Sequence, residues 1–176
     1  MTEINLHTSE IRSMAGKLHA GDRILLSGTV YTSRDAAHKR ISTLLDNGKP
    51  LPFPLKDSVI YYSGSTPAPK DLPIGSCGPT TSGRMDIHTP RLYDLGVVAT
   101  IGKGERSKEV IDAICRNRAA YFCALGGAGA LAAQSVTSCK VIAFEDLGCE
   151  AVKRLDICDF PLIVGIDCNG GSIFER

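Results

Sequence analysis

The chain has 176 residues, 43% of them hydrophobic and 22% charged, and its formal net charge is +1. This length suits one domain with a real core, and the balanced charge offers no electrostatic reason to expect nucleic acid as a partner. No apolar run approaches the roughly 18 residues of a membrane span, and the N-terminal stretch MTEINLHTSEIR lacks the apolar core of a secretion signal. The composition therefore argues against a membrane protein and predicts a cytoplasmic one.

Seven cysteines are spread along the chain, and none of them forms a C-x-x-C pair. An odd number of cysteines in a chain without a secretion signal predicts free thiols in a reducing compartment. Their spacing matches no zinc or iron–sulfur pattern, so we interpret most of them as small buried hydrophobic residues. They are Cys77, Cys115, Cys123, Cys139, Cys149, Cys158 and Cys168.

The first half of the chain predicts short helices and strands. Thr8 or Ser9 can cap a helix with an apolar stripe that begins at Ile11. A buried strand is predicted over 23–30, a helix over 35–45 and a second strand over 58–62. The stretch 64–83 is rich in glycine and proline and cannot hold a long regular element, so we expect a functional or disordered loop.

The second half of the chain alternates more regularly between strands and helices. Strands alternating with helices are typical of an α/β domain, and we expect a single compact one. The predicted strands cover 97–101, 120–125, 141–144 and 162–166, and the predicted helices cover 108–116 and 128–134.

Three polar clusters stand at strand ends or in loops, where binding and catalytic residues tend to lie. The first, residues 27–40 (SGTVYTSRDAAHKR), runs from a strand through small polar residues into a helix. The free N–H groups of the helix and the fixed charge of Arg34 together make a plausible receptor for a carboxylate or phosphate. The same residues fit an ordinary capped helix with solvated basic side chains, and the pattern leaves both interpretations open.

The second cluster, residues 77–86 (CGPTTSGRMD), sets three hydroxyl residues between glycines and follows them with Arg84. Glycine lets backbone N–H groups approach a ligand closely, so this combination favours a functional loop over a surface turn. The third cluster, residues 102–106 (GKGER), directly follows a predicted strand, where Lys103 can point its ammonium group into a cleft. Taken by itself, however, a lysine between two glycines is more typical of an exposed turn.

A glycine-rich stretch, residues 125–132 (LGGAGALA), contains G-x-G-x-x-A between a predicted strand and a predicted helix. This is a weak form of the dinucleotide-binding fingerprint, and Glu145 lies 18 residues beyond Gly127, near the place of a ribose-binding acid. The motif falls late in the chain, and small residues also allow tight packing of a helix on a strand. We favour the packing role and keep a non-catalytic nucleotide-binding module as an alternative function.

Six stretches, in their order along the chain, resemble the C-terminal domain of class I fumarases and the beta subunit of tartrate dehydratases. They cover nearly the whole chain, and the first two are long and specific enough to make chance a poor explanation. The stretches are GDRILLSGTVYTSRDAAHKRI (21–41), GPTTSGRMD (78–86), IGKGE (101–105), GGAGALAA (126–133), FEDLGCEA (144–151) and DFPLIVGIDCNG (159–170).

This resemblance implies a swivelling β/β/α domain that spans 1–176, in agreement with the predicted alternation of elements. It also implies a [4Fe–4S]-dependent hydro-lyase that reversibly hydrates a dicarboxylate, with fumarate to (S)-malate as the expected reaction and tartrate dehydration as an alternative. In that family the cluster cysteines belong to the other domain or subunit. We therefore expect a beta subunit without a metal site of its own, active only with an alpha subunit in an α2β2 heterotetramer.

The resemblance also implies roles for individual residues. Thr80 aligns with the catalytic base, and the substrate-binding cations align with Arg34, Arg84 and Lys103. Arginine binds carboxylates bidentately, and nearby cations stabilise the charge that develops when a proton leaves the carbon beside a carboxylate. A hydroxyl is a poor base at neutral pH, so Thr80 needs neighbours such as Arg84 and Lys103 to stabilise its alkoxide. The carboxylates expected to orient the arginines are Asp35 and Asp86.

Overall fold

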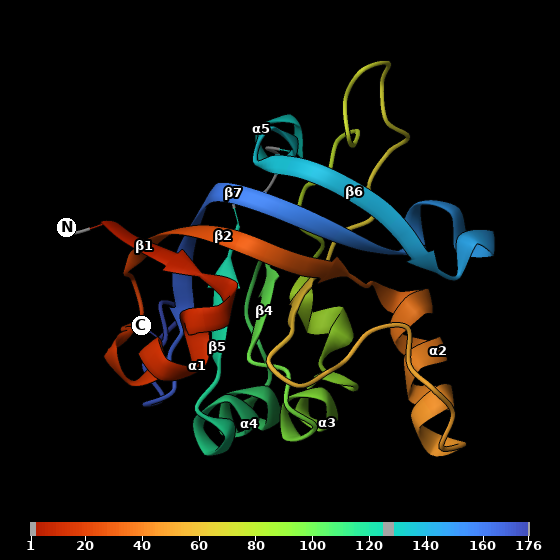
Figure 1. Cartoon of the computed structure of the whole chain (residues 1–176). Helices are drawn as coiled ribbons and strands as arrows, with labels where there is room; N and C mark the ends of the chain where they lie inside the picture. Colours follow the sequence, from red (N-terminus) through yellow and green to blue (C-terminus); the bar gives the residue numbers. More distant parts are fainter. Residues whose placement is uncertain (1–2, 125–128, 176) are drawn as a thin grey trace.

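A sheet of seven strands that closes on itself lies at the centre of the structure, a computed structural model that describes residues 3–124 and 129–175 (Figure 1). The strand order is β1-β2-β3-β4-β5-β7-β6, and β2 also pairs with β7. The first five strands run parallel to their neighbours, whereas β7 is antiparallel to β2, β5 and β6. The strands are β1 (Glu3–His7), β2 (Arg23–Thr32), β3 (Val59–Tyr61), β4 (Ala99–Gly102), β5 (Ala120–Cys123), β6 (Val136–Ala143) and β7 (Val152–Ile166).

The longest strand, β7, closes the sheet because it has a neighbour on each side. Its first half lies between β6 and β2, and its second half lies between β2 and β5. The register with β2 shifts between Leu26 and Gly28, opposite Asp159, whose φ of 50° bends the strand. The α/β class expected from the sequence is confirmed, with a barrel-like closure of the sheet that the sequence did not predict.

Helices α2, α3 and α4 lie together on one side of the sheet, below the strands in Figure 1. Ser107 starts α4 by accepting a hydrogen bond from the amide of Val110, and Arg118 ends it in the left-handed conformation. The N-cap of α2 is Arg34, which makes no capping bond, so the first N–H groups of α2 are open to other partners. No described helix is long and apolar enough to cross a membrane. The helices are α1 (Ile11–Met14), α2 (Asp35–Asp46), α3 (Thr89–Asp94), α4 (Lys108–Asn117) and α5 (Gly129–Gln134), with 3-10 turns η1 (Thr8–Glu10), η2 (Ala15–Lys17), η3 (Ser82–Met85) and η4 (Glu145–Glu150).

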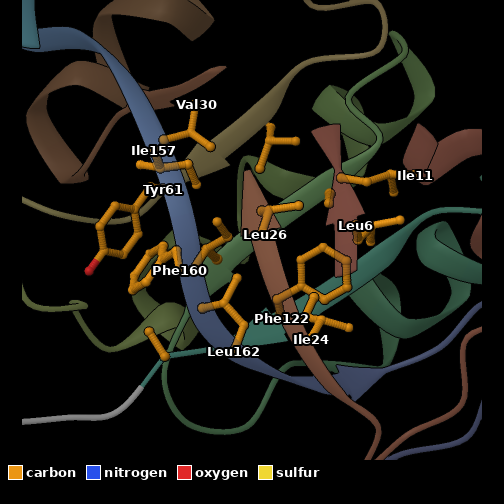
Figure 2. Close-up of a cluster of buried hydrophobic side chains, with 14 of the residues drawn as sticks. Leu6, Ile11, Ile24, Leu26, Val30, Tyr61, Phe122, Ile157, Phe160 and Leu162 are labelled. Atoms are coloured by element: carbon orange, nitrogen blue, oxygen red, sulfur yellow. The ribbon is translucent and has the colours of Figure 1, made fainter. Parts of the chain in front are cut away.

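Alternate residues of the strands face two separate hydrophobic cores, as the two-residue period of a strand requires. In β3, Tyr61 belongs to the core inside the closed sheet, and Ile60 belongs to the core under the helices. Figure 2 shows the inner core, in which the rings of Tyr61 and Phe160 meet edge to face with their centroids 5.5 Å apart. Each buried Leu, Ile or Phe side chain contributes about 1.5–3 kcal/mol, so this core holds the strands together. The side chains labelled there are Leu6, Ile11, Ile24, Leu26, Val30, Tyr61, Phe122, Ile157, Phe160 and Leu162.

Most of the expected elements are present. The strand expected over 23–30 is β2, and the helices expected over 35–45 and 108–116 are α2 and α4. The N-terminal helix is a single α turn between two 3-10 turns, and the expected element ends at Leu125 and Ala128 lie outside the described residues. The sequence patterns did not predict β1, α3 and the first parts of β6 and β7.

Candidate functional site

The carboxyl ends of β2, β3 and β4 lie side by side at one edge of the sheet. The amide of Ser33 donates to the carbonyl of Tyr61 at 3.1 Å, and the amide of Tyr62 donates to the carbonyl of Ile101 at 2.9 Å, so the pairing continues past the strand ends. In α/β proteins ligands bind outside the carboxyl ends of parallel strands. We call the four residues near this edge the candidate site: Arg34, Thr80, Arg84 and Lys103.

Asp35, the first residue of α2, joins two arginines of the candidate site. Nε of Arg84 donates to Oδ1 of Asp35 at 3.0 Å, and Nη2 lies 3.0 Å from Oδ2 without the alignment of a hydrogen bond. Nη2 of Arg34 lies 3.7 Å from the same Oδ2. One carboxylate thus contacts both guanidinium groups, although the two arginines come from different segments of the chain.

Glu150, which the sequence analysis did not single out, brings a second carboxylate to Arg34. Its Oε1 lies 3.8 Å from Nε of Arg34 and accepts a long hydrogen bond of 3.4 Å from the amide of Ala36. Gly64 makes room for Arg34, because a Cβ there would lie 3.0 Å from Cδ of the arginine. A carboxylate that settles at a helix N-terminus beside an arginine indicates that this place suits an anion.

The segment 80–84 runs alongside the turn that carries Lys103. The amide of Thr80 donates to the carbonyl of Tyr62 at 2.7 Å, and the amide of Ser82 donates to the carbonyl of Lys103 at 2.9 Å. The second and third clusters of the sequence analysis therefore meet in space, next to the start of α2.

The three adjacent hydroxyl residues differ in their exposure. Ser82 is buried, and its Oγ accepts a hydrogen bond of 2.8 Å from Oη of Tyr121. Thr80 is half-buried and Thr81 is exposed. An enclosed hydroxyl that already holds an internal hydrogen bond is badly placed to meet a substrate. This geometry therefore favours Thr80 and Thr81 over Ser82 as residues within reach of a ligand.

Asp86 contacts Arg106 and not one of the substrate-binding arginines that it was expected to orient. Its Oδ1 accepts a hydrogen bond of 2.7 Å from Nε of Arg106, and its Oδ2 accepts one of 2.6 Å from the amide of Ser107. The side chain of Arg106 is 0% exposed, whereas that of Arg84 is 53% exposed. Asp86 therefore fixes a buried arginine, and Asp35 is the carboxylate that holds Arg84.

His38 is a fully buried histidine of α2, one turn after Arg34. Its Nδ1 lies 2.7 Å from Oγ of Ser33 and 3.0 Å from the carbonyl of Arg34, and its buried Nε2 bonds to none of the described residues. Burial, opposed by the hydrogen bond to the carbonyl of Arg34, lowers the pKa of His38 to about 4. The neutral ring therefore belongs to the folded state.

We expect the free energy of unfolding to fall as the pH is lowered from about 6.5 to about 4. The unfolded chain protonates His38 near the ordinary pKa of about 6.5, whereas the folded chain does so near a pKa of about 4. Between these two pKa values the unfolded state binds one more proton than the folded state. The free energy of unfolding therefore falls by about 1.4 kcal/mol for each unit by which the pH is lowered. Urea unfolding at a series of pH values measures this slope. His38→Gln should reduce this slope, and His19→Gln, at a side chain that is 69% exposed, is the control. An unchanged slope in the His38 variant would contradict the assignment.

The glycine-rich stretch of the alternative function lies partly outside the described residues, which resume at Gly129. A Cβ at Gly129 would lie 2.1 Å from Oγ of Ser76, and the carbonyl of Gly129 accepts a hydrogen bond of 3.2 Å from the amide of Cys77. Gly129 therefore lets α5 pack closely on the neighbouring loop. This contact favours the packing role over nucleotide binding.

The described residues do not fit an iron–sulfur cluster. Within residues 3–124 and 129–175, no group of three or more His, Cys, Asp or Glu side chains could hold a metal ion. The seven cysteines are free thiols, some buried and some exposed. A cluster needs several thiolates converging on one place, and the cysteines of this fold do not supply them.

Comparison with known proteins gives a consistent set of relatives. The model of the family described as Fumarase C-terminus matches residues 1–176. Fumarate hydratase 2 of Leishmania major is 37% identical over 169 residues, which cover 95% of this chain and 30% of that protein. The anaerobic class I fumarate hydratase of Escherichia coli (strain K12) is 36% identical over 176 residues, which cover 99% of this chain and 32% of that protein. The chain thus spans about a third of the length of these two relatives.

One relative has nearly the same length as this chain. A protein of Methanocaldococcus jannaschii, named "Putative L(+)-tartrate dehydratase subunit beta", is 39% identical over 168 residues. The match covers 91% of this chain and 85% of that protein.

Proposed function

Because the chain belongs to the Fumarase C-terminus family, we propose that it is the beta-type subunit of a hydro-lyase that reversibly hydrates a dicarboxylate, with fumarate and (S)-malate as the expected pair. One observation carries the proposal: Arg34 and Arg84 share Asp35, and the segment 80–84, which carries Thr80, is hydrogen-bonded to the carbonyl of Lys103. The barrel-like sheet with α2, α3 and α4 on one side supports the assignment as a swivelling β/β/α domain.

A dicarboxylate needs cations at both of its ends, and the candidate site offers three. Arg34 and the N–H groups at the start of α2 bind one carboxylate, in the place where Glu150 accepts a hydrogen bond from the amide of Ala36 in the chain by itself. Arg84 and Lys103 bind the carboxylate beside the carbon that loses its proton. That carboxylate gains negative charge as the C–H bond breaks, and a fixed guanidinium and ammonium stabilise the charge.

Thr80 holds the proton that moves. In the dehydration direction its Oγ1, as an alkoxide, takes the proton from one carbon, while hydroxide leaves the neighbouring carbon toward the partner, whose cluster would supply the Lewis acid for that group. In the hydration direction water would supply the hydroxide, and the hydroxyl of Thr80 returns the proton to carbon. An alkoxide at neutral pH requires cations nearby. Arg84 lies on the same segment as Thr80, and Lys103 lies on the adjacent turn, so these two residues supply the cations. The hydrogen bond from the amide of Thr80 to the carbonyl of Tyr62 anchors the backbone of the base.

We also propose that an alpha subunit completes this site and holds the [4Fe–4S] cluster, in an α2β2 assembly. The side chain of Arg84 is 53% exposed and that of Arg34 is 24% exposed, whereas charges act strongly on a substrate only where water is excluded. A covering partner would exclude that water. The name of the Methanocaldococcus jannaschii relative, a beta subunit, and the greater length of the fumarate hydratases support a second component.

Dehydration of L-tartrate is the second candidate function, because the relative that matches this chain over 85% of its own length is named for that reaction. The test combines this chain with an alpha subunit under anaerobic conditions and measures kcat/KM for fumarate, (S)-malate and L-tartrate. The ratio of these constants separates the two candidates. The chain could instead bind a dinucleotide tightly and show no partner-dependent reaction of any of the three acids. That result would overturn the hydro-lyase proposal in favour of the nucleotide-binding module.

We expect the isolated chain to bind no stoichiometric cluster and to show no hydratase activity until the alpha subunit is added. The reason is that no set of converging thiolates lies within the described residues. Anaerobic reconstitution with iron and sulfide, followed by absorption spectroscopy and iron analysis, measures the result. A cluster bound at one per chain, or turnover without a partner, would contradict the two-subunit assignment.

A further inference from the structure

Arg106, in the turn that follows β4, is a buried cation that the proposed reaction does not use directly. Nε donates to Oδ1 of Asp86 at 2.7 Å, and Nη1 donates to Oγ1 of Thr100 at 3.2 Å. Nη2 donates to Oη of Tyr62 and to Oγ1 of Thr89, each at 3.1 Å. A buried charge persists only where it is paired and hydrogen-bonded, so these acceptors fix the guanidinium in one orientation.

Two tyrosine rings flank the guanidinium and extend its contacts toward the candidate site. Cζ of Arg106 lies 4.7 Å from the ring centroid of Tyr121 and 5.2 Å from that of Tyr62. Oη of Tyr121 lies 2.8 Å from Oγ of Ser82 and 2.9 Å from the carbonyl of Gly104. Ser82 belongs to the segment 80–84, and Gly104 directly follows Lys103. The hydroxyl group of Tyr121 therefore contacts both segments that carry the candidate residues.

The two segments also pack directly against each other above this network. The amide of Ser82 donates to the carbonyl of Lys103, and a Cβ at Gly102 would lie 1.9 Å from Oγ of Ser82. Asp86 lies two residues beyond the segment 80–84 and accepts a hydrogen bond from the amide of Ser107, three residues after Gly104. A shift of the guanidinium would therefore move both segments relative to each other.

We propose that Arg106 is a positioning residue that fixes the segment carrying Thr80 and Arg84 against the turn carrying Lys103. The catalytic consequence rests on the proposed function, whereas the geometry does not. Lysine cannot replace Arg106, because its ammonium group lacks the planar fork that reaches four acceptors and stacks between two rings. A displacement of about 1 Å at a catalytic group can cost about 10²-fold in rate.

Two variants test this proposal, one at Arg106 itself and one at Tyr121. Arg106→Lys keeps the charge and loses the fork, and Tyr121→Phe removes one oxygen while keeping the ring and the guanidinium. Tyr121→Phe keeps the test valid if Arg106→Lys fails to fold. Ile24→Val is the matched control, because it removes a buried methyl group from the inner core, away from this network.

Amide hydrogen exchange of the full chain gives a readout that needs no activity. We expect the amides of Thr80 and Ser82 to exchange at least about tenfold faster in both variants. The amides of α2 and β2 should change no more than they do in Ile24→Val. Exchange that rises evenly over the whole chain would overturn the proposal, because it would show a general loss of stability.

Kinetics of the assembled enzyme give the second readout. Tyr121→Phe should lower kcat at least about tenfold and change KM less, because Arg34 at the start of α2 lies outside the network. An unchanged kcat in a variant with faster local exchange would overturn the claim that Arg106 positions these segments for the reaction. If the wild-type assembly turns over none of the three acids, the proposed function fails. The hydrogen-exchange data still test whether Arg106 positions the two segments.

Discussion

Replacing Thr80 by alanine is expected to lower kcat of the assembled enzyme by about 10²–10⁴-fold, the usual contribution of a general base. KM should change little, because a base acts in the transition state and the carboxylates bind to other side chains. The fold should survive, since Thr80 is half-buried and its backbone hydrogen bond to Tyr62 does not involve the side chain. Steady-state kinetics of wild type and variant, each combined with the alpha subunit, measure the loss.

The neighbouring hydroxyls supply the controls for this prediction. Thr80→Ser keeps a hydroxyl at the same place and should retain most of the activity, whereas Thr81→Ala removes an exposed side chain and should have a small effect. Ser82→Ala removes the acceptor for Tyr121 and should act through the position of the segment. If Thr80→Ala keeps more than about a tenth of kcat, well short of the loss expected for a base, and Thr81→Ala loses nearly all of it, the base is Thr81. If all three alanine variants keep their activity, the base lies elsewhere, and the partner subunit is the first place to look for it.

Sequence patterns predicted the parts of the candidate site that depend on local structure. A strand that runs into a helix puts Arg34 and Asp35 at a helix start, and a strand that ends at Gly102 puts Lys103 at the edge of the sheet. Glu150 could not be predicted in the same way, because its contact with Arg34 depends on how η4 packs on α2. Local periodicity carries no information about such a distant pairing.

The partner of Asp86 shows a second limit of the sequence. The sequence predicts that Asp35 and Asp86 orient the substrate-binding arginines, and Arg84 lies two residues before Asp86. The 3-10 turn η3 separates them, so that Arg84 reaches Asp35 and Asp86 reaches the buried Arg106. Arginine is rarely buried in full, so the residue type of Arg106 alone does not indicate a buried cation. The signal that sequence reasoning lacked is the set of hydroxyl acceptors around Arg106.

The closure of the sheet could not be predicted from the sequence for a similar reason. β7 contains Lys153, Arg154, Asp156 and Pro161, a composition that does not resemble a central strand. Its inward positions are apolar, and Leu155, Ile157, Phe160 and Leu162 belong to the inner core. The bulge at Asp159 interrupts the two-residue period, so the pattern over the whole strand is not continuous.

Arg34→Ala and Arg84→Ala are each expected to lower kcat/KM of the assembled enzyme by about 10–150-fold. This range corresponds to the loss of one hydrogen-bonded contact with a charged group, worth about 1.5–3 kcal/mol. Neither side chain is part of a hydrophobic core, and both are partly exposed, so the melting temperature should change little. Kinetics with each acid, together with thermal unfolding followed by circular dichroism, measure both effects.

Arg84→Lys separates the geometry of the guanidinium from its charge. Nε and Nη2 of Arg84 lie against the two oxygens of Asp35 and turn the rest of the fork outward, and lysine cannot reproduce this arrangement. We therefore expect Arg84→Lys to lose nearly as much kcat/KM as Arg84→Ala, although its charge is kept. Arg91→Ala is the matched control, because Arg91 is a half-exposed arginine that pairs with Asp46 on α2, away from the candidate site. Wild-type kcat/KM in either alanine variant would show that the receptor has been assigned to the wrong arginine. Full activity in Arg84→Lys would show that a point charge suffices and that the pairing with Asp35 does not orient the group for catalysis.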